Sequence, residues 1–220
     1  MHTNFSTTAA RESGAPHCDA SPGRRGLGTQ ADVADALARL DSGADPHAQV
    51  AVEVGTPASV LLHHGWVDRT STIVVDLGAQ GIDLVDVDVA FLPATVARLT
   101  MLQPRPLLEG RAGPVDRSDL DALVGPAPSD RPRPAADVAR AAGRWPDVAQ
   151  SLLTGAWRLC VVDVADSRTG STQTEQLSWL DTPAGLLRVD GYPHAPVLTG
   201  TSAESIWESL VATLPAHRRA

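Results

Sequence analysis

The sequence contains no lysine, only two cysteines and three aromatic residues besides tryptophan, and no apolar run long enough to cross a membrane. All 18 basic residues are arginine, against 26 acidic residues, and the net charge is −8. A negative field repels phosphate backbones, and no basic cluster carries interleaved aromatics, so nucleic-acid binding is disfavoured. A spanning helix needs about 20 apolar residues, and no secretory signal opens the chain. We therefore expect a cytoplasmic protein without membrane insertion.

The two cysteines lie in different settings. Cys18 belongs to a polar stretch, whereas Cys160 lies in an apolar run typical of a buried strand. A disulfide is not expected in a reducing compartment. Cys160 is interpreted as a small core residue, because free cysteine is among the most buried residue types.

The 220 residues permit a single domain preceded by a leader. Residues 1–29 are rich in Gly, Ser, Thr and Pro and show little apolar periodicity, which predicts a disordered leader. Residues 30–215 are predicted to form one α+β domain. It divides into a first half (30–106), a linker and helical subdomain (107–155), and a second half (156–215).

The first half reads as a helix, four strands and a closing helix. The helix is expected from Ala31 to Leu40, and the closing helix from Val89 to Leu102. The four strands are predicted at Gln49–Val54, Ser59–Trp66, Thr72–Leu77 and Ile82–Val87. Their links, including a hairpin at 78–81, are too short for crossovers, so the strands should be antiparallel.

The middle section combines short helices with proline-rich sequence. Ser118 is a good N-cap for a helix over Asp119–Val124. Four prolines in Gly125–Pro134 predict a loop or extended linker. The stretch Ala135–Leu153 reads as helical with a break at 143–146, and its second helix should start near Pro146.

The second half repeats the plan of the first. Strands are predicted at Trp157–Asp163, Gln176–Leu180, Leu186–Val189 and Ala195–Thr199, with a polar loop at 166–174 and a turn at 181–185. Ser202 should cap a last helix that ends at Leu214. Its apolar face should comprise Ile206, Trp207, Leu210, Val211 and Leu214. Two such halves predict one largely antiparallel central sheet with pseudo-twofold character and helices packed on it.

The chain shows no catalytic, cofactor-binding or metal-binding pattern. His63 and His64 are adjacent in a predicted strand, so their rings should point to opposite faces and cannot easily share a metal. Asp83, Asp86 and Asp88 alternate with valines and fit a solvated strand edge better than a calcium loop. No nucleophile elbow is present. The sequence therefore favours a protein that is not an enzyme and has no cofactor.

Five tryptophans stand out in a chain with so few other aromatics. Four of them, Trp66, Trp157, Trp179 and Trp207, are expected in the core. Trp145 differs because it sits in a Gly-Arg-Trp-Pro break between helices. Exposed tryptophans are enriched at interface hot spots, so Trp145 is the best single candidate for partner contact.

Three segments together resemble the EspG family of cytosolic chaperones of type VII (ESX) secretion. The first is the hairpin sequence Ser178-Trp-Leu-Asp-Thr-Pro-Ala-Gly-Leu-Leu-Arg-Val189. The second is Phe91-Leu-Pro-Ala-Thr-Val-Ala-Arg-Leu99 with its exit Leu102-Gln-Pro-Arg-Pro106, and the third is the final helix Ser202–Leu214. Family members usually begin with an apolar helix and strand ahead of the segment that starts here at Ala31.

The resemblance implies a binding function. Members of this family bind the helical tip of PPE-type substrates and shield its apolar patch from self-association, by helix-in-groove recognition. By position, the family's contact region corresponds here to Trp145, Val148, Leu152 and Leu153. Asp181 is expected to accept hydrogen bonds within its own turn, and Gly185 to let the chain reverse.

Two other functions remain open from the residues alone. One is a small soluble enzyme in which an acid such as Asp163 or Asp181 is the general base; a convergent pocket around a perturbed acid would favour it. The other is a homodimeric structural module that pairs through a free sheet edge. An exposed apolar patch on helices would favour the chaperone.

Overall fold

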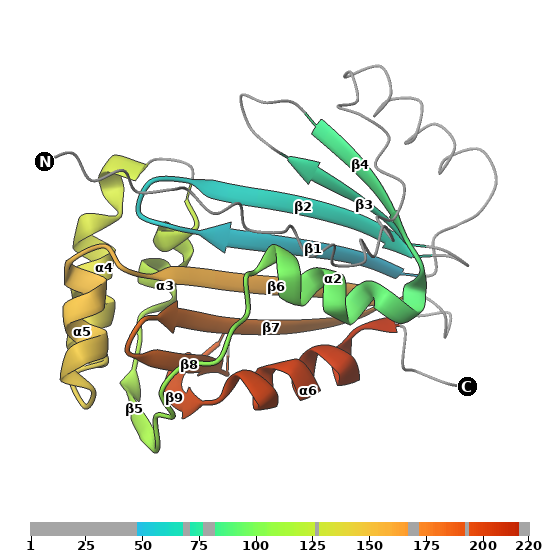
Figure 1. Ribbon diagram of the computed structural model, residues 1–220. Coiled ribbons are helices and arrows are strands. Elements are labelled where there is room, and N and C mark those ends of the chain that lie inside the picture. The colour runs from blue at the N-terminus through green and yellow to red at the C-terminus, as the bar shows by residue number, and fades with distance from the viewer. Residues whose placement is uncertain are drawn as a thin grey trace, which may run out of the picture.

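A computed structural model describes residues 48–67, 71–76, 82–125, 128–166, 172–191 and 194–215. The predicted leader, the helix at 31–40 and the hairpin turn at 78–81 lie outside these residues. The described strands form one nine-stranded sheet in the order β4-β3-β2-β1-β6-β7-β8-β9-β5, and every neighbouring pair is antiparallel. Helices pack on this sheet (Figure 1). The α+β class and the largely antiparallel sheet are confirmed.

The first four strands form a meander, as their short links predict. Their bounds are β1 (Ala48–Gly55), β2 (Val60–Val67), β3 (Ser71–Asp76) and β4 (Ile82–Val87). In β1 the valines alternate with Gln49, Ala51 and Glu53, and Val50, Val52 and Val54 are all buried. A short 3-10 turn, η2 (Val89–Phe91), leads into helix α2 (Leu92–Leu99), so the predicted helix ends three residues earlier than expected.

The second meander joins the first through β1 and β6. Its strands are β6 (Arg158–Asp166), β7 (Gln173–Thr182), β8 (Gly185–Asp190) and β9 (Val197–Thr201). Helix α6 (Ala203–Thr213) follows, with the Ser202 side chain accepting a hydrogen bond from the backbone N–H of Ser205, as predicted for its N-cap. The turn between β7 and β8 is tighter than expected, because Thr182 and Gly185 are still paired.

The two meanders place their closing helices on the same face of the sheet. Helices α2 and α6 lie side by side there (Figure 1). They bury one core cluster with strand residues such as Val52, Val162 and Trp179. Cys160 is fully buried in this cluster, as predicted, and burial raises the pKa of its thiol. The two halves therefore share one sheet, with α2 and α6 in corresponding places.

The middle section covers part of the opposite face. It contains β5 (Arg111–Pro114), α3 (Arg117–Leu123), η3 (Pro128–Asp130), α4 (Pro132–Ala141) and α5 (Pro146–Leu153). These helices gather at one end of the sheet (Figure 1). They form a second core cluster with Leu159, Leu180 and Leu187, which alternate along their strands with residues that face α2 and α6.

Two predictions for the middle section are wrong. Helix α3 is capped by Asp116, whose carboxylate accepts the Ser118 backbone N–H at 2.8 Å, so Ser118 is inside the helix. The expected linker at Gly125–Pro134 contains η3 and the start of α4. Arg131 is only 2% exposed and donates to the carbonyls of Thr56 and Gly125, which ties this segment to the β1–β2 turn.

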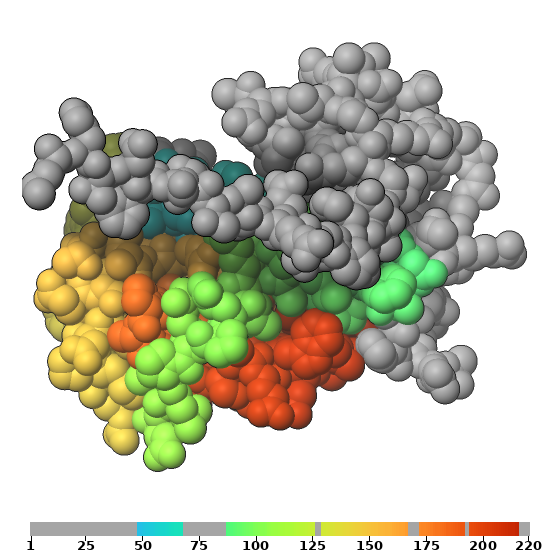
Figure 2. All heavy atoms as spheres, in the orientation of Figure 1, coloured from blue at the N-terminus to red at the C-terminus, as the bar shows by residue number. Residues whose placement is uncertain are grey.

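Residues 103–110, here called the strap, connect α2 to β5 without regular structure. The strap runs over the surface between the helices α4–α5 and α6 (Figure 2). Leu108 packs so closely that a Cβ built on Gly185 or Gly200 would lie within 2.4 Å of it. Among the described residues, no helix is long and apolar enough to cross a bilayer.

Candidate functional site

Three of the four predicted partner-binding residues are core residues. Trp145 is 8% exposed, and Val148 and Leu152 are at most 1% exposed. The Trp145 indole N–H donates to the backbone carbonyl of Glu109 in the strap at 3.3 Å. The expectation that the α4–α5 helices present Trp145 and Leu152 at the surface is wrong, because both side chains pack in the second core cluster. Leu153, at 60% exposed, is the one predicted residue that a partner could reach.

Large apolar side chains are exposed at other places in the described chain. They are Phe91 (65%), Met101 (52%), Leu107 (64%), Leu153 (60%) and Trp207 (39%). Trp207 was expected in the core, but on α6 it is Ile206 and Leu210 that are fully buried. Phe91 and Met101 flank α2, and Leu107 is on the strap. Sequence reasoning missed Phe91, Met101 and Leu107, which lie outside the α-helices. It placed Trp207 in the core because a helical period defines the buried stripe and not the partly covered residue beside it.

Asp181 joins the two segments on which the family resemblance mainly rests. Its carboxylate is 2% exposed and accepts from Arg105 Nε of the strap at 2.8 Å. It also accepts from Arg158 Nη2 of β6. The local turn bond is instead made by Thr182, whose hydroxyl donates to the Gly185 carbonyl at 3.0 Å. The prediction that Asp181 bonds within its own turn is therefore wrong, and the residue fixes the strap to the sheet.

The sheet face opposite α2 and α6 carries two half-buried carboxylates on neighbouring strands. Asp163 lies opposite Ala51 on β1, and Glu53 is two residues further along that strand. Burial raises the pKa of Glu53, and the carboxylate of Asp163 raises it further. Burial also raises the pKa of Asp163, while the Gln176 amide, which donates to it at 2.6 Å, opposes that shift.

The two acids suggested as alternative general bases lie on opposite faces of the sheet. Asp181 is held by Arg105 and Arg158 and is only 2% exposed, so its carboxylate is not open to a substrate. Asp163 is half-buried on the sheet face opposite α2 and α6. His63 is buried and His64 exposed, as predicted for opposite faces, and within the described residues no three His, Cys, Asp or Glu side chains could hold a metal.

No protein-family model matches the sequence, and no curated protein matches it. Among solved structures, the chain is similar to the type VII secretion system chaperone EspG5 of Mycobacterium tuberculosis, determined in complex with a PE25-PPE41 dimer. The two chains are 12% identical, with a TM-score of 0.48. The similarity covers 82% of this chain and 78% of that chain.

Proposed function

We propose that this protein is a cytoplasmic chaperone that binds a helical, PPE-type substrate of type VII secretion and needs no cofactor. The proposal rests on the three segments that resemble the EspG family. They are the Asp-Thr-Pro-Ala-Gly hairpin, the mid-chain helix with its proline-rich exit, and the final helix.

The observation that carries the proposal is the contact between these segments. Arg105, from the exit of the mid-chain helix, pairs with Asp181 of the hairpin 76 residues later. Helix α6, the third segment, packs beside α2. The three segments contact one another in the folded chain, which supports the proposal that their likeness to the family belongs to one structural element.

Binding would use exposed apolar side chains on a rigid support. Leu153 ends helix α5, whose other face is anchored by Val148 and Leu152 in the second core cluster. An anchor on such a helix costs little conformational entropy when a partner helix covers it. Trp145, Val148 and Leu152 would therefore support the contact from within, and Leu153 would make it.

The test is co-expression of the full chain with a PPE-type protein encoded beside it, followed by co-purification and calorimetry. Leu153→Ala should weaken binding more than tenfold, because loss of an interface anchor costs about 2 kcal/mol. Gln150→Ala, one turn earlier and also exposed, is the matched control and should change little. Trp145→Ala should lower the free energy of unfolding by about 3–5 kcal/mol, as judged by urea denaturation, without changing the affinity of the folded protein.

The outcomes separate the function from its site. If the wild-type chain binds no such substrate, the chaperone proposal is wrong. If it binds and Leu153→Ala binds equally well, the function stands and the site lies elsewhere, with Phe91, Leu107 and Trp207 the next exposed residues to replace. Light scattering of the free chain tests the alternative of a homodimeric module.

A further inference from the structure

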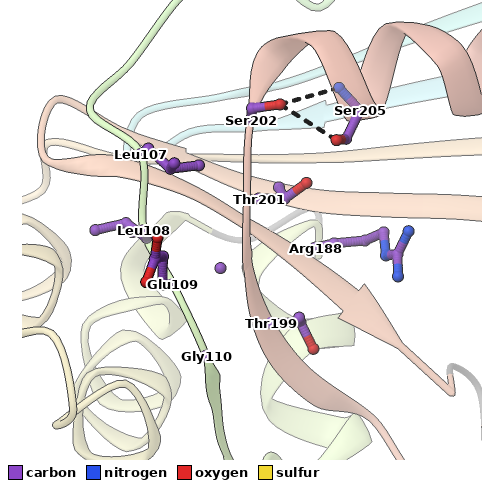
Figure 3. Close-up of a pocket in the computed structure, with 10 residues that line it drawn as sticks. Leu107, Leu108, Glu109, Gly110, Arg188, Thr199, Thr201, Ser202 and Ser205 are labelled. Carbon is purple, nitrogen blue, oxygen red and sulfur yellow. Dashed lines mark hydrogen bonds between the residues drawn. The ribbon is translucent and has the colours of Figure 1, made fainter.

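A pocket of about 400 Å³ lies between the strap, the strands β8 and β9, and the first turn of α6. The strap contributes residues 107–110, and α6 contributes Ser202 and Ser205 (Figure 3). Arg188, Thr199 and Thr201 line it from the sheet. None of these residues belongs to the contact proposed above for a partner helix.

The pocket contains hydroxyl groups without hydrogen-bond partners. Thr201 is 9% exposed, and no hydrogen bond joins its side chain to any described residue. The hydroxyl of Thr199 is buried and likewise has no partner in the described part of the chain. A buried hydroxyl without a partner costs free energy. The Thr199 hydroxyl, with Thr201 two residues further along the same pocket wall, therefore points to a ligand with oxygen acceptors.

The register of the sheet places two arginines on either side of Thr199. Thr199 lies opposite Arg188 on β8 and opposite Arg111 on β5. Directly opposite residues of antiparallel strands project to the same face of a sheet. Asp190 accepts from Arg188 Nε at 2.6 Å, and the two terminal nitrogens of that guanidinium make no hydrogen bond or ion pair with any described residue. Glu109 is the one acidic residue that lines the pocket.

Helix α6 adds backbone donors at the same place. Ser202 caps the helix by accepting the Ser205 N–H at 3.1 Å, and its carbonyl accepts the Ile206 N–H. The N–H groups of Ala203 and Glu204 precede the first intrahelical bonds. A helix N-terminus with such free donors favours negative charge.

The geometry points to an oxyanion-binding site in this pocket, for a carboxylate or phosphate group with two or more acceptor oxygens. The first turn of α6 and the Thr201 hydroxyl would donate to the oxygens, and Arg188 would balance the charge from the pocket wall. Arg111 does not line the pocket itself and would add positive charge from the neighbouring strand. Glu109 would limit affinity for a doubly charged anion. This site goes beyond the proposed chaperone function and does not depend on it.

The experiment is an NMR titration of the full ¹⁵N-labelled chain with inorganic phosphate and, separately, with acetate. We expect saturable shifts at the amides of Thr201, Ala203 and Glu204. Thr201→Val and Arg188→Gln should each weaken binding about tenfold, because each removes a hydrogen bond to a charged group. Glu109→Gln should strengthen it. Arg98→Gln, an exposed arginine on α2, is the charge-matched control and should have no effect.

The two ions distinguish the source of the anion. Saturation by phosphate alone indicates a phosphate-bearing ligand, and saturation by acetate as well, with competition between the two, indicates a carboxylate. The proposal is overturned if neither ion gives saturable shifts, or if Thr201→Val and Arg188→Gln, each with an otherwise wild-type spectrum, bind as well as the control.

Discussion

Met101 ends α2 in a left-handed backbone conformation, with φ of 51°. The N–H of Leu102 donates to the Ala97 carbonyl and that of Met101 to Arg98, the hydrogen-bond pattern of a helix end that normally carries glycine. A residue with a Cβ destabilises the fold by about 1 kcal/mol when it adopts this conformation. The predicted helix end at Leu102 overlooked this reversal, because methionine gives no stop signal.

Met101→Gly should therefore stabilise the protein by about 0.5–1 kcal/mol, through relief of strain at the helix end. The measurement is urea denaturation. Met101→Ala removes the same exposed side chain but keeps the strain, so it should leave the stability nearly unchanged. A glycine variant no more stable than the alanine variant would contradict the argument.

Asp181→Asn should lower the free energy of unfolding by about 2–4 kcal/mol. Loss of one partner from a buried ion pair costs about 3–5 kcal/mol, and partial exposure of Arg105 and Arg158, at 20% and 15%, reduces this. The exposed pair of Arg117 and Asp121 is the control, and Arg117→Gln should cost about 0.5 kcal/mol or less. Equal effects of the two changes would show that Asp181 does not fix the strap.

Two tryptophans show why the exposure of residues at the candidate site could not be predicted from the sequence alone. Trp145 precedes a proline and sits in a helix break, which suggests exposure, yet the strap covers it and Glu109 supplies its hydrogen-bond partner. Trp207 follows Ile206 on α6 and is more than one-third exposed. Neither outcome follows from local pattern, because both depend on which distant segment covers the side chain.

At the scale of elements, the sequence was enough to predict the strands and the helix breaks. It was not enough to predict which segments pack over them. Alternating valines located β1, and the break before Pro146 located the start of α5. Asp116 and Ser118 are both good N-caps, and local propensity cannot choose between them. The strap has no periodicity, so its path across β8 and β9 is visible only in the structure.

Gly200→Ala should displace the strap. A Cβ at this position would lie 2.3 Å from the Leu108 carbonyl oxygen, a backbone atom that cannot move alone. We expect a loss of about 1–3 kcal/mol, as for other overpacked sites, together with faster amide hydrogen exchange in residues 107–110. Gly113→Ala is the control, since nothing lies within 4 Å of its Cβ position. Unchanged exchange in the strap of the Gly200 variant would refute the close packing.

At the scale of the whole molecule, the half-buried acids on the sheet face opposite α2 and α6 should make stability depend on pH. The pKa values of Glu53 and Asp163 are raised above their ordinary values of 4.5 and 3.8, so the folded chain holds these protons more tightly than the unfolded chain. The resulting stabilisation should be fully present below the ordinary values, and it should be lost as pH rises through the raised pKa of each group.

Asp163→Asn should raise the melting temperature at neutral pH and flatten its dependence on pH in the mildly acidic range. The asparagine keeps an oxygen that can accept from Gln176 while the repulsion with Glu53 disappears. Glu208→Gln, on the exposed side of α6, serves as the comparison and should not alter the slope. If the wild-type protein instead becomes less stable as pH falls from neutral to about pH 5, other groups dominate the pH dependence.

The pairing of β1 with β6 has a consequence for how the chain is synthesised. Its eight paired positions, from Ala48 with Asp166 to Gly55 with Leu159, connect the two halves of the sequence. The first meander leaves the ribosome long before β6 exists, so one edge of β1 stays unpaired during translation. Long-range pairing of this kind forms slowly and leaves strand edges open to aggregation. The interval between synthesis of the two meanders is thus the period in which the nascent chain most needs protection.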